Sequence, residues 1–249
     1  MSLARTVSTA LVALLLVLGA GCSPDTPDTP AGPRPVTAEE AQLLAATRFL
    51  NYNAVSRSVG TTIGARGQQV QVTGWVDFTT HTGYATANGA GFAPQLLRWN
   101  LGTVAVQPGS PSSTAEPGMP MPTSGWQSRT MDPERSDLDL VLLVISNLGL
   151  DRPENPLLLQ QGGALWLGTE QVDGHELTQY AAPPTDQGAS TSPQTSVDPG
   201  ASGLRLWIDE VGRLHRADIR VSSGWVTVTF GDGRGTSLPA LPTPSATRS

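Results

Sequence analysis

Alternation of apolar and polar residues at a period of two constrains the fold of this chain more than any other feature. The clearest case is QVQVTGWVDF at 69–78, where one side of the extended chain is apolar. Its apolar members are Val70, Val72, Val76 and Phe78. Such alternation is typical of a β-strand that turns one face to a core and the other away from it. The segment therefore predicts a sheet with two unlike faces.

Further strand-like runs follow, and short turns separate them. GYATAN (83–88) reads as one strand, PQLLRWNLGTVAV (94–106) as one or two, and 164–182 as a hairpin that turns at Asp173–Gly174. The segment 204–230 predicts three more strands, with turns at Val211–Gly212 and Ser223–Gly224. Because short turns can join only antiparallel neighbours, we expect a long antiparallel meander. A sheet this wide twists and curls.

Helical patterns interrupt the strands at two places. Thr37 and Glu40 form a T-x-x-E capping box in front of the helical segment 38–55. A second helix begins near Ser136–Asp137, carries a continuous apolar stripe, and has Gly149 as its expected C-cap. The segment 153–161 predicts another short helix. These helices would cover the concave apolar face of the curled sheet.

The N-terminal segment has the three parts of a secretory signal. Arg5 supplies a positive charge, residues 11–18 are apolar, and small residues precede Cys22. The apolar run is about half of the ~20 residues that a transmembrane helix needs. Cleavage before Cys22 and acylation of that cysteine would follow from the pattern, which resembles a bacterial lipobox. An ordinary signal peptide with a chance cysteine is the alternative.

Low-complexity composition divides the rest of the chain. We expect a signal peptide over 1–21, an acylated cysteine with a Pro-rich tether over 22–36, and a single domain over 37–238. Segments 107–124 and 183–202 are rich in Pro, Ser and Gly and predict disordered loops within that domain. Residues 239–249 predict a disordered tail. The strand patterns resume after each loop, which favours insertions in one domain over domain boundaries.

Composition excludes several classes of function. The 249-residue chain has a formal net charge of −6, and its basic residues are all arginine and form no cluster. This charge argues against a nucleic-acid partner and against electrostatic attachment to anionic lipid. Cys22 is the only cysteine, so its acylation would leave no thiol for disulfide or redox chemistry.

Several of these features together resemble a known family. The cysteine behind small residues, the capped helix, the V-x-G-x-V-D-F strand and the W-I-D-x-x-G-R-L-x-R hairpin over 207–216 are similar to those of LppX/LprG-type lipoproteins. These proteins belong to the LolA-like superfamily of exported lipoprotein and lipid carriers. The resemblance implies an α+β fold: a curled antiparallel β half-barrel of about nine or more strands, packed on two or three helices. It also implies a cavity between sheet and helices that holds acyl chains.

The apolar faces of the expected sheet and helices provide the candidate cavity lining. The sheet would contribute Val70, Val72, Val76, Phe78, Leu97, Trp99 and Trp166, and the second helix would contribute Leu138, Leu142, Ile145 and Leu148. A dry slot between two apolar layers can hold an acyl chain, since each buried methylene contributes about 0.8 kcal/mol. The alternative is that the layers pack together as an ordinary core. Strand phase decides which set points inward, because a shift of one residue exchanges the faces.

Other chemistry-bearing residues favour structural roles. Asp132, Glu134, Asp137 and Asp139 precede or begin the second helix, where capping and solvation explain them better than a cation site. The three histidines are far apart in sequence and lack metal-ligand spacing. No G-x-S-x-G elbow occurs. We therefore expect no metal, no cofactor and no enzyme activity.

The expected function is binding. The resemblance implies a monomeric lipoprotein, anchored by its N-terminal acyl group at the extracytoplasmic face of the cell membrane, that carries a lipid, glycolipid or acyl-chain ligand across the envelope. The alternative is a surface-interaction or envelope-sensing lipoprotein with a fully packed core and a protein partner. Fold alone does not choose between the two.

Overall fold

In the computed structural model the described residues are 32–89, 92–108, 116–184, 198–235 and 237–239, all in the compact unit Gly32–Ser249. The expected signal peptide 1–21 and Cys22 lie outside the described residues, as do 109–115, 185–197 and 240–249. The described helices are α1 (Ala38–Asn53), α2 (Asp137–Ser146) and α3 (Pro156–Gln161). None of them combines the length and apolar character that crossing a bilayer requires.

The described strands form one 12-stranded sheet in which each neighbouring pair is antiparallel. The strands are β1 (Arg34–Pro35), β2 (Ser56–Ile63), β3 (Val70–Asp77), β4 (Thr82–Gly89), β5 (Phe92–Trp99), β6 (Thr103–Pro108), β7 (Gln127–Thr130), β8 (Leu165–Val172), β9 (His175–Ala181), β10 (Leu204–Ile208), β11 (Leu214–Val221) and β12 (Gly224–Gly233).

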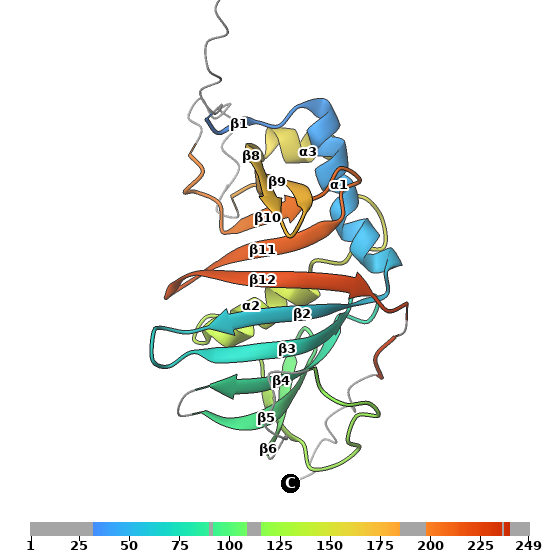
Figure 1. The fold of residues 1–249 in the computed structure, drawn as a ribbon, viewed down its shortest axis with the longest axis vertical. Helices are drawn as coiled ribbons and strands as arrows, with labels where there is room; N and C mark the ends of the chain where they lie inside the picture. The colour runs from blue at the N-terminus through green and yellow to red at the C-terminus, as the bar shows by residue number, and fades with distance from the viewer. Residues whose placement is uncertain (1–31, 90–91, 109–115, 185–197, 236, 240–249) are drawn as a thin grey trace, which may run out of the picture. The chain divides into compact units, whose positions relative to one another are not determined.

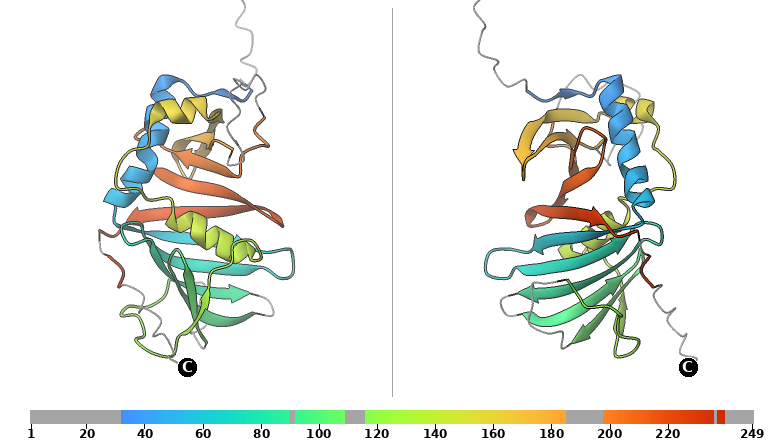
Figure 2. Two further views of the ribbon diagram at one scale, coloured as in Figure 1. Left: turned by 180° about the vertical axis from the view of Figure 1, so that it is seen from behind. Right: turned by 45° about the vertical axis from the view of Figure 1, so that its right-hand side comes forward.

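The strand order is β1-β8-β9-β10-β11-β12-β2-β3-β4-β5-β6-β7, so β1 and β7 are the edges of the described sheet; Figure 1 labels all of these strands except β7. The open edges and the curl of the strands make a half-barrel. In Figure 2, α2 lies across one face of the sheet and α1 runs beside it. The prediction of a curled antiparallel half-barrel packed on two or three helices is confirmed.

The first helix forms as its capping box predicts. The Thr37 hydroxyl accepts a hydrogen bond from the Glu40 amide at 3.2 Å, and the Glu40 carboxylate accepts one from the Thr37 amide at 2.8 Å. Both bonds satisfy amides that the first helical turn would leave unpaired. The capping box therefore fixes where α1 begins.

Apolar residues on the helix side of the sheet form one continuous core. Val72, Val76 and Phe78 belong to it, whereas Trp75, between them in β3, belongs to a smaller cluster with Tyr84 on the opposite face. The strand phase assumed from the sequence is therefore the phase of the structure. One residue of a segment expected to be a disordered loop contributes to the smaller cluster: Met121 of 107–124 is buried there, together with Leu238 at the end of the expected domain.

Residues at the end of the expected tether join the sheet. Arg34 and Pro35 form β1 and pair with Trp166 and Leu165 of β8. Val36 is buried, and its amide donates to the Ala164 carbonyl at 3.3 Å. Within the described residues, therefore, the ordered domain begins before residue 37.

The second helix begins at Asp137 with Ser136 as its N-cap, as expected, but Gly149 is not its C-cap. The helix ends at Ser146, and Asn147 occupies the cap. Gly149 instead allows close packing, because a Cβ at that position would lie 2.5 Å from the Phe78 Cβ. The glycine thus serves the contact between the two layers.

Candidate functional site

The structure brings the eleven predicted lining residues into one apolar core. Eight of them are buried in its interior: Val72, Val76, Phe78, Leu97, Trp99, Leu142, Ile145 and Leu148. The other three are partly buried and pack against it: Val70, Leu138 and Trp166. Their role in ligand binding stays a prediction.

Helix α2 is in direct contact with the sheet at β3, β4 and β11, and it reaches β5 through Trp99. The Trp99 indole N–H donates to the Ser146 hydroxyl at 2.9 Å, and both side chains are buried. The Asn51 side-chain amide donates to the Leu148 carbonyl at 2.8 Å. This half of the helix–sheet interface is an ordinary packed core.

A cavity of about 320 Å³ lies at the other half, and it is partly open to solvent. Its walls come from α1, from the last turn of α2 and the segment that follows, from α3, and from the chain around β9 and β10. The lining residues are Leu44, Arg48, Leu143, Val144, Asn147, Leu148, Glu154, Leu159, Ala182, Pro183, Leu204 and Leu206. Leu148 is the one predicted lining residue in this set.

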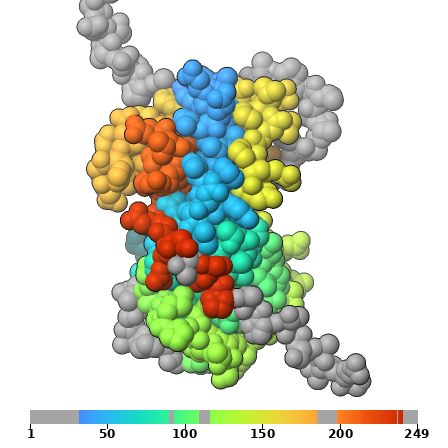
Figure 3. All heavy atoms as spheres, turned by 90° about the vertical axis from the view of Figure 1, so that its right-hand side faces the viewer, coloured from blue at the N-terminus to red at the C-terminus, as the bar shows by residue number. Residues whose placement is uncertain are grey.

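Backbone hydrogen bonds hold the α2–α3 connection along α1. The Leu150 amide donates to the Arg48 carbonyl at 3.1 Å, and the Glu154 amide donates to the Ala45 carbonyl at 3.0 Å. Helices α1 and α3 pack side by side, with α3 in yellow next to α1 in blue (Figure 3). The connection therefore forms a wall that holds α1 and α2 in place around the cavity.

Three polar side chains interrupt the apolar lining: Arg48, Asn147 and Glu154. Arg48 donates from Nη1 to the Glu154 carboxylate at 3.1 Å, and both side chains are 28% exposed. The Nε of Arg48 is buried and has no hydrogen-bond partner among the described residues. A buried donor without a partner is costly, so a ligand acceptor at this position would be stabilised.

The composition of the cavity limits what it can bind. Most of the residues that line the cavity are aliphatic, and such a lining suits a hydrocarbon chain. The ion pair and the free Nε of Arg48 suit one polar group bearing acceptor oxygens. Among the described residues no group of three metal-ligating side chains comes together. The site can bind and orient an amphipathic molecule.

The acidic residues near α2 have partners within the protein. Asp137 accepts from the hydroxyls of Ser222 and Ser223, and Asp139 accepts from Arg129. Both contacts fasten the start of α2 to neighbouring strands and turns, so these two carboxylates hold the helix on the sheet, a role that differs from the expected capping and solvation. Two of the three histidines lie together: the His175 and His215 rings are tilted by 36° with their centroids 5.2 Å apart, whereas the His81 ring contacts the Ser146 carbonyl.

Sequence reasoning missed most of the cavity wall. Leu44 and Leu159 lie in segments that were expected to be helical, and Leu204 and Leu206 alternate in an expected strand. These patterns showed apolar faces but not which face stays uncovered. Arg48, Asn147 and Glu154 carried no sequence signal of a site.

Comparison with protein-family models gives no match. Comparison with curated proteins gives no match either. Similar solved structures include LprF from Mycobacterium bovis, at 15% identity and a TM-score of 0.44, with 83% of this chain and 99% of that chain covered. They also include the lipoprotein LppX from Mycobacterium tuberculosis, at 17% identity and a TM-score of 0.40, with 80% and 98% covered.

A DUF1329 family protein from Desulfovibrio piger is similar at 12% identity and a TM-score of 0.27, with 81% of this chain and 96% of that chain covered. LppX, one of the two names attached to the sequence resemblance, is thus among the similar structures.

Proposed function

We propose that this chain is an exported, lipid-anchored protein that binds a hydrophobic ligand, a lipid, glycolipid or acyl chain, and carries it across the cell envelope. The apolar cavity between α1, α2, α3 and β10 is the observation that supports this role. Its volume of about 320 Å³ falls at the lower end of the roughly 300–1,000 Å³ typical of small-molecule sites. Binding needs no chemical step.

The physical basis of the binding is burial of hydrocarbon. Each methylene moved from water to the cavity contributes about 0.8 kcal/mol. A segment of about ten methylenes would contribute roughly 8 kcal/mol before the costs of ordering the ligand. Leu44, Leu143, Val144 and Leu206 supply the apolar contact, and Arg48 supplies donors for one polar end of the ligand.

The anchor is proposed from the N-terminal sequence. Residues 1–21 would direct export, and the acylated Cys22 would hold the domain at the extracytoplasmic face of the membrane through the tether that follows. All of these residues except the end of the tether lie outside the described part of the chain. The domain would act as a monomer.

A packed core favours the alternative function, an interaction or envelope-sensing lipoprotein with a protein partner. Trp99, Leu142 and Ile145 were predicted from the sequence to line the ligand site. They are at most 1% exposed and belong to the packed core. The two functions differ in whether the cavity holds a lipid. Purification of the full chain from a lipid-containing host, followed by solvent extraction and mass spectrometry, distinguishes them. Stoichiometric extracted lipid supports the carrier; a clean extract without fatty-acid uptake supports the interaction protein.

Replacing Ala182 by tryptophan is expected to reduce uptake of a fluorescent fatty acid by about tenfold or more. Ala182 lines the cavity, and an indole ring there would displace part of the ligand. Loss of only two buried methylenes already corresponds to about a tenfold change in affinity. Titration of the fatty acid into the purified full chain measures the effect. Ala93→Trp, on an exposed position of β5, is the matched control and should bind like the parent. Equal binding by both variants would mean that the fatty acid does not occupy this cavity.

Replacing Cys22 by alanine is expected to abolish acylation and to leave an unprocessed precursor or a released protein. Cys22 is the only cysteine, so no other thiol can take its place. Intact mass of the purified chain and its distribution between washed membranes and medium report the change. Processing and membrane attachment as in the parent would refute the lipobox interpretation and leave the cavity unaffected.

A further inference from the structure

Helix α3 exposes two adjacent leucines beside the cavity. Leu157 and Leu158 are 62% and 63% exposed, the largest values for any large apolar side chain in the described part of the protein. Leu159, the next residue, points to the other side and lines the cavity. The same short helix thus presents apolar side chains to the ligand site and to solvent.

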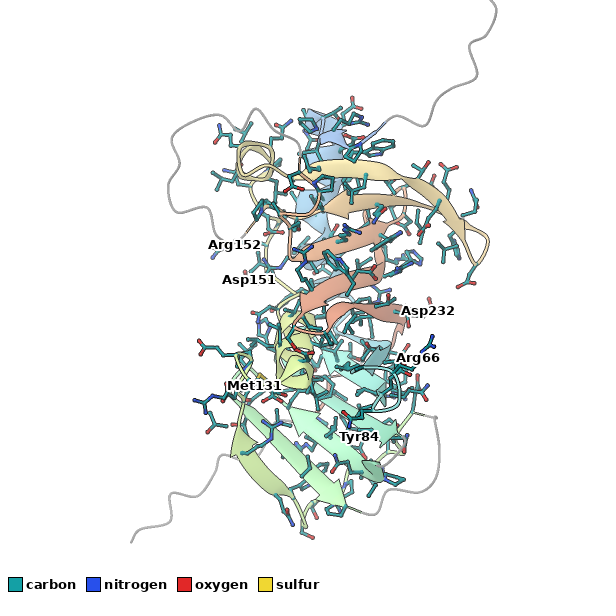
Figure 4. All side chains as sticks on the ribbon, turned by 90° about the vertical axis from the view of Figure 1, so that its left-hand side faces the viewer. Arg66, Tyr84, Met131, Asp151, Arg152 and Asp232 are labelled. Carbon is teal, nitrogen blue, oxygen red and sulfur yellow. The ribbon has the colours of Figure 1, made fainter. Side chains whose placement is uncertain are left out.

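The exposed leucines, here called the α3 tip, have no charged neighbour within their helix, whose sequence is PLLLQQ. The charged residues of the preceding connection have partners: Glu154 contacts Arg48 at 3.1 Å, and Arg152 lies 3.7 Å from Asp151 at the outer surface (Figure 4). Burial of the α3 tip in an apolar environment would therefore not remove any charged side chain of α3 from water, because α3 has none. An uncharged apolar tip is suited to the boundary between headgroups and acyl chains.

The tip lies where the chain from Cys22 joins the domain. The Gln160 side-chain amide donates to the Val36 carbonyl at 3.2 Å, and Arg34–Pro35 pairs with β8. Arg34 is twelve positions after Cys22, with eleven residues between them. Since a chain spans at most about 3.6 Å per residue, an acyl anchor at Cys22 would hold β1 within about 43 Å of the bilayer. Because α3 contacts the chain directly after β1, an anchor at Cys22 would keep α3 within reach of the membrane.

We propose that Leu157 and Leu158 insert into the surface of a lipid bilayer and bring the cavity next to its lipids. This inference rests on the proposed function, because it gives the route by which a membrane lipid would reach the cavity. Two leucines bury less hydrocarbon than a single acyl chain, which by itself gives only reversible membrane binding. The tip therefore docks transiently, while the anchor at Cys22 keeps its local concentration at the membrane high.

A site-specific fluorescent label tests the docking. In the full chain with Cys22→Ala, Leu158→Cys supplies the single thiol for an environment-sensitive dye, and Leu101→Cys, 45% exposed in the β5–β6 turn at the other end of the sheet, is the matched control. With phosphatidylcholine vesicles we expect a severalfold rise in emission at position 158 and its quenching by brominated acyl chains. Position 101 should not change. Both variants contain the same residues 1–31, so a difference in their fluorescence response comes from the position of the dye.

Two results would overturn the proposal. One is an equal response at positions 158 and 101, or none at 158. The other is a response at 158 that follows protein concentration without vesicles, which would identify a contact between copies of the chain.

Uptake measurements separate this inference from the proposed function. The double variant Leu157→Ser with Leu158→Ser should take up a fluorescent fatty acid from solution like the parent, since neither leucine lines the cavity. It should remove the fatty acid from vesicles about tenfold more slowly. If neither protein takes up fatty acid, the carrier role fails, while the label at position 158 still reports docking. Equal removal rates in two proteins that both bind would refute the role of the tip.

Discussion

Replacement of Trp99 by alanine is expected to lower the free energy of unfolding by about 3–5 kcal/mol, the usual cost of deleting a fully buried tryptophan. Trp99 is 0% exposed, and its indole donates to the Ser146 hydroxyl at 2.9 Å. Its ring also lies against Gly83, where an added Cβ would be only 2.0 Å from a ring atom. The neighbouring residues cannot move in to fill the space of a whole indole ring. Most of the free-energy cost of the resulting cavity therefore remains in the variant.

The same variant tests whether Trp99 lines the ligand site. Because it lies outside the observed cavity, fatty-acid uptake per folded molecule should equal that of the parent, with stability measured by denaturant unfolding. Trp225→Ala is the control: Trp225 is partly exposed on the opposite face, beneath Arg205 and Arg220, and should cost no more than about 2 kcal/mol. A small loss of stability with altered ligand uptake would instead assign Trp99 to the ligand.

The strand pattern predicted the architecture because it reflects a physical requirement that each strand meets locally. Val72 and Val76 must face the core and Thr73 must not, so the period of two is visible in the sequence. The edge strands carry no such signal. All four residues of β7 (Gln127–Thr130) are exposed, and β1 has only two residues. Their strand character comes from pairing with β6 and β8, which the sequence does not show.

The cavity was not predictable because apolar faces do not reveal how closely they approach. Gly83 and Gly149 allow α2 and Trp99 to pack tightly against β3 and β4, which removes any slot there. On the other side of the core, α1 and the α2–α3 connection hold the helices away from β10, and the space remains there. Which of the two halves closes depends on contacts between residues about 100 positions apart, such as Arg48 with Glu154.

Helix α2 contributes to both halves of the interface: Leu142 and Ile145 are buried in the packed core, whereas its last turn lines the cavity. Asp139 fastens its first turn: both oxygens of the buried carboxylate accept hydrogen bonds from Arg129 of β7, one of them at 2.6 Å, and one also accepts from the Asp132 amide at 2.7 Å. The last turn of the same helix contributes Leu143 and Val144 to the cavity. A change at Asp139 thus acts on the helix that separates the packed half from the cavity.

Asp139→Asn is expected to lower the free energy of unfolding by about 3 kcal/mol at neutral pH. Removal of one partner of a buried ion pair costs about 3–5 kcal/mol. The lower end applies because the Arg129 side chain is 48% exposed and can be hydrated once its partner is gone. Asp132→Asn is the matched control, since Asp132 is 47% exposed on its side chain and its nearest cation, Arg135, is 3.9 Å away. That change should stay within about 0.5 kcal/mol.

The effect of Asp139→Asn should also depend on pH. Burial alone would raise the pKa of the Asp139 carboxyl, but hydrogen bonds from Arg129 and the Asp132 amide hold that pKa below its ordinary value of 3.8. A carboxyl whose pKa is lower in the folded state stabilises the fold above the unfolded pKa, and this stabilisation is lost as the pH falls through the folded value. The difference between parent and variant should therefore be full above about pH 5 and shrink below about pH 4. Denaturant unfolding at a series of pH values measures it. A difference that stays constant down to pH 2 would mean that the loss comes from packing and that the carboxylate charge does not hold α2.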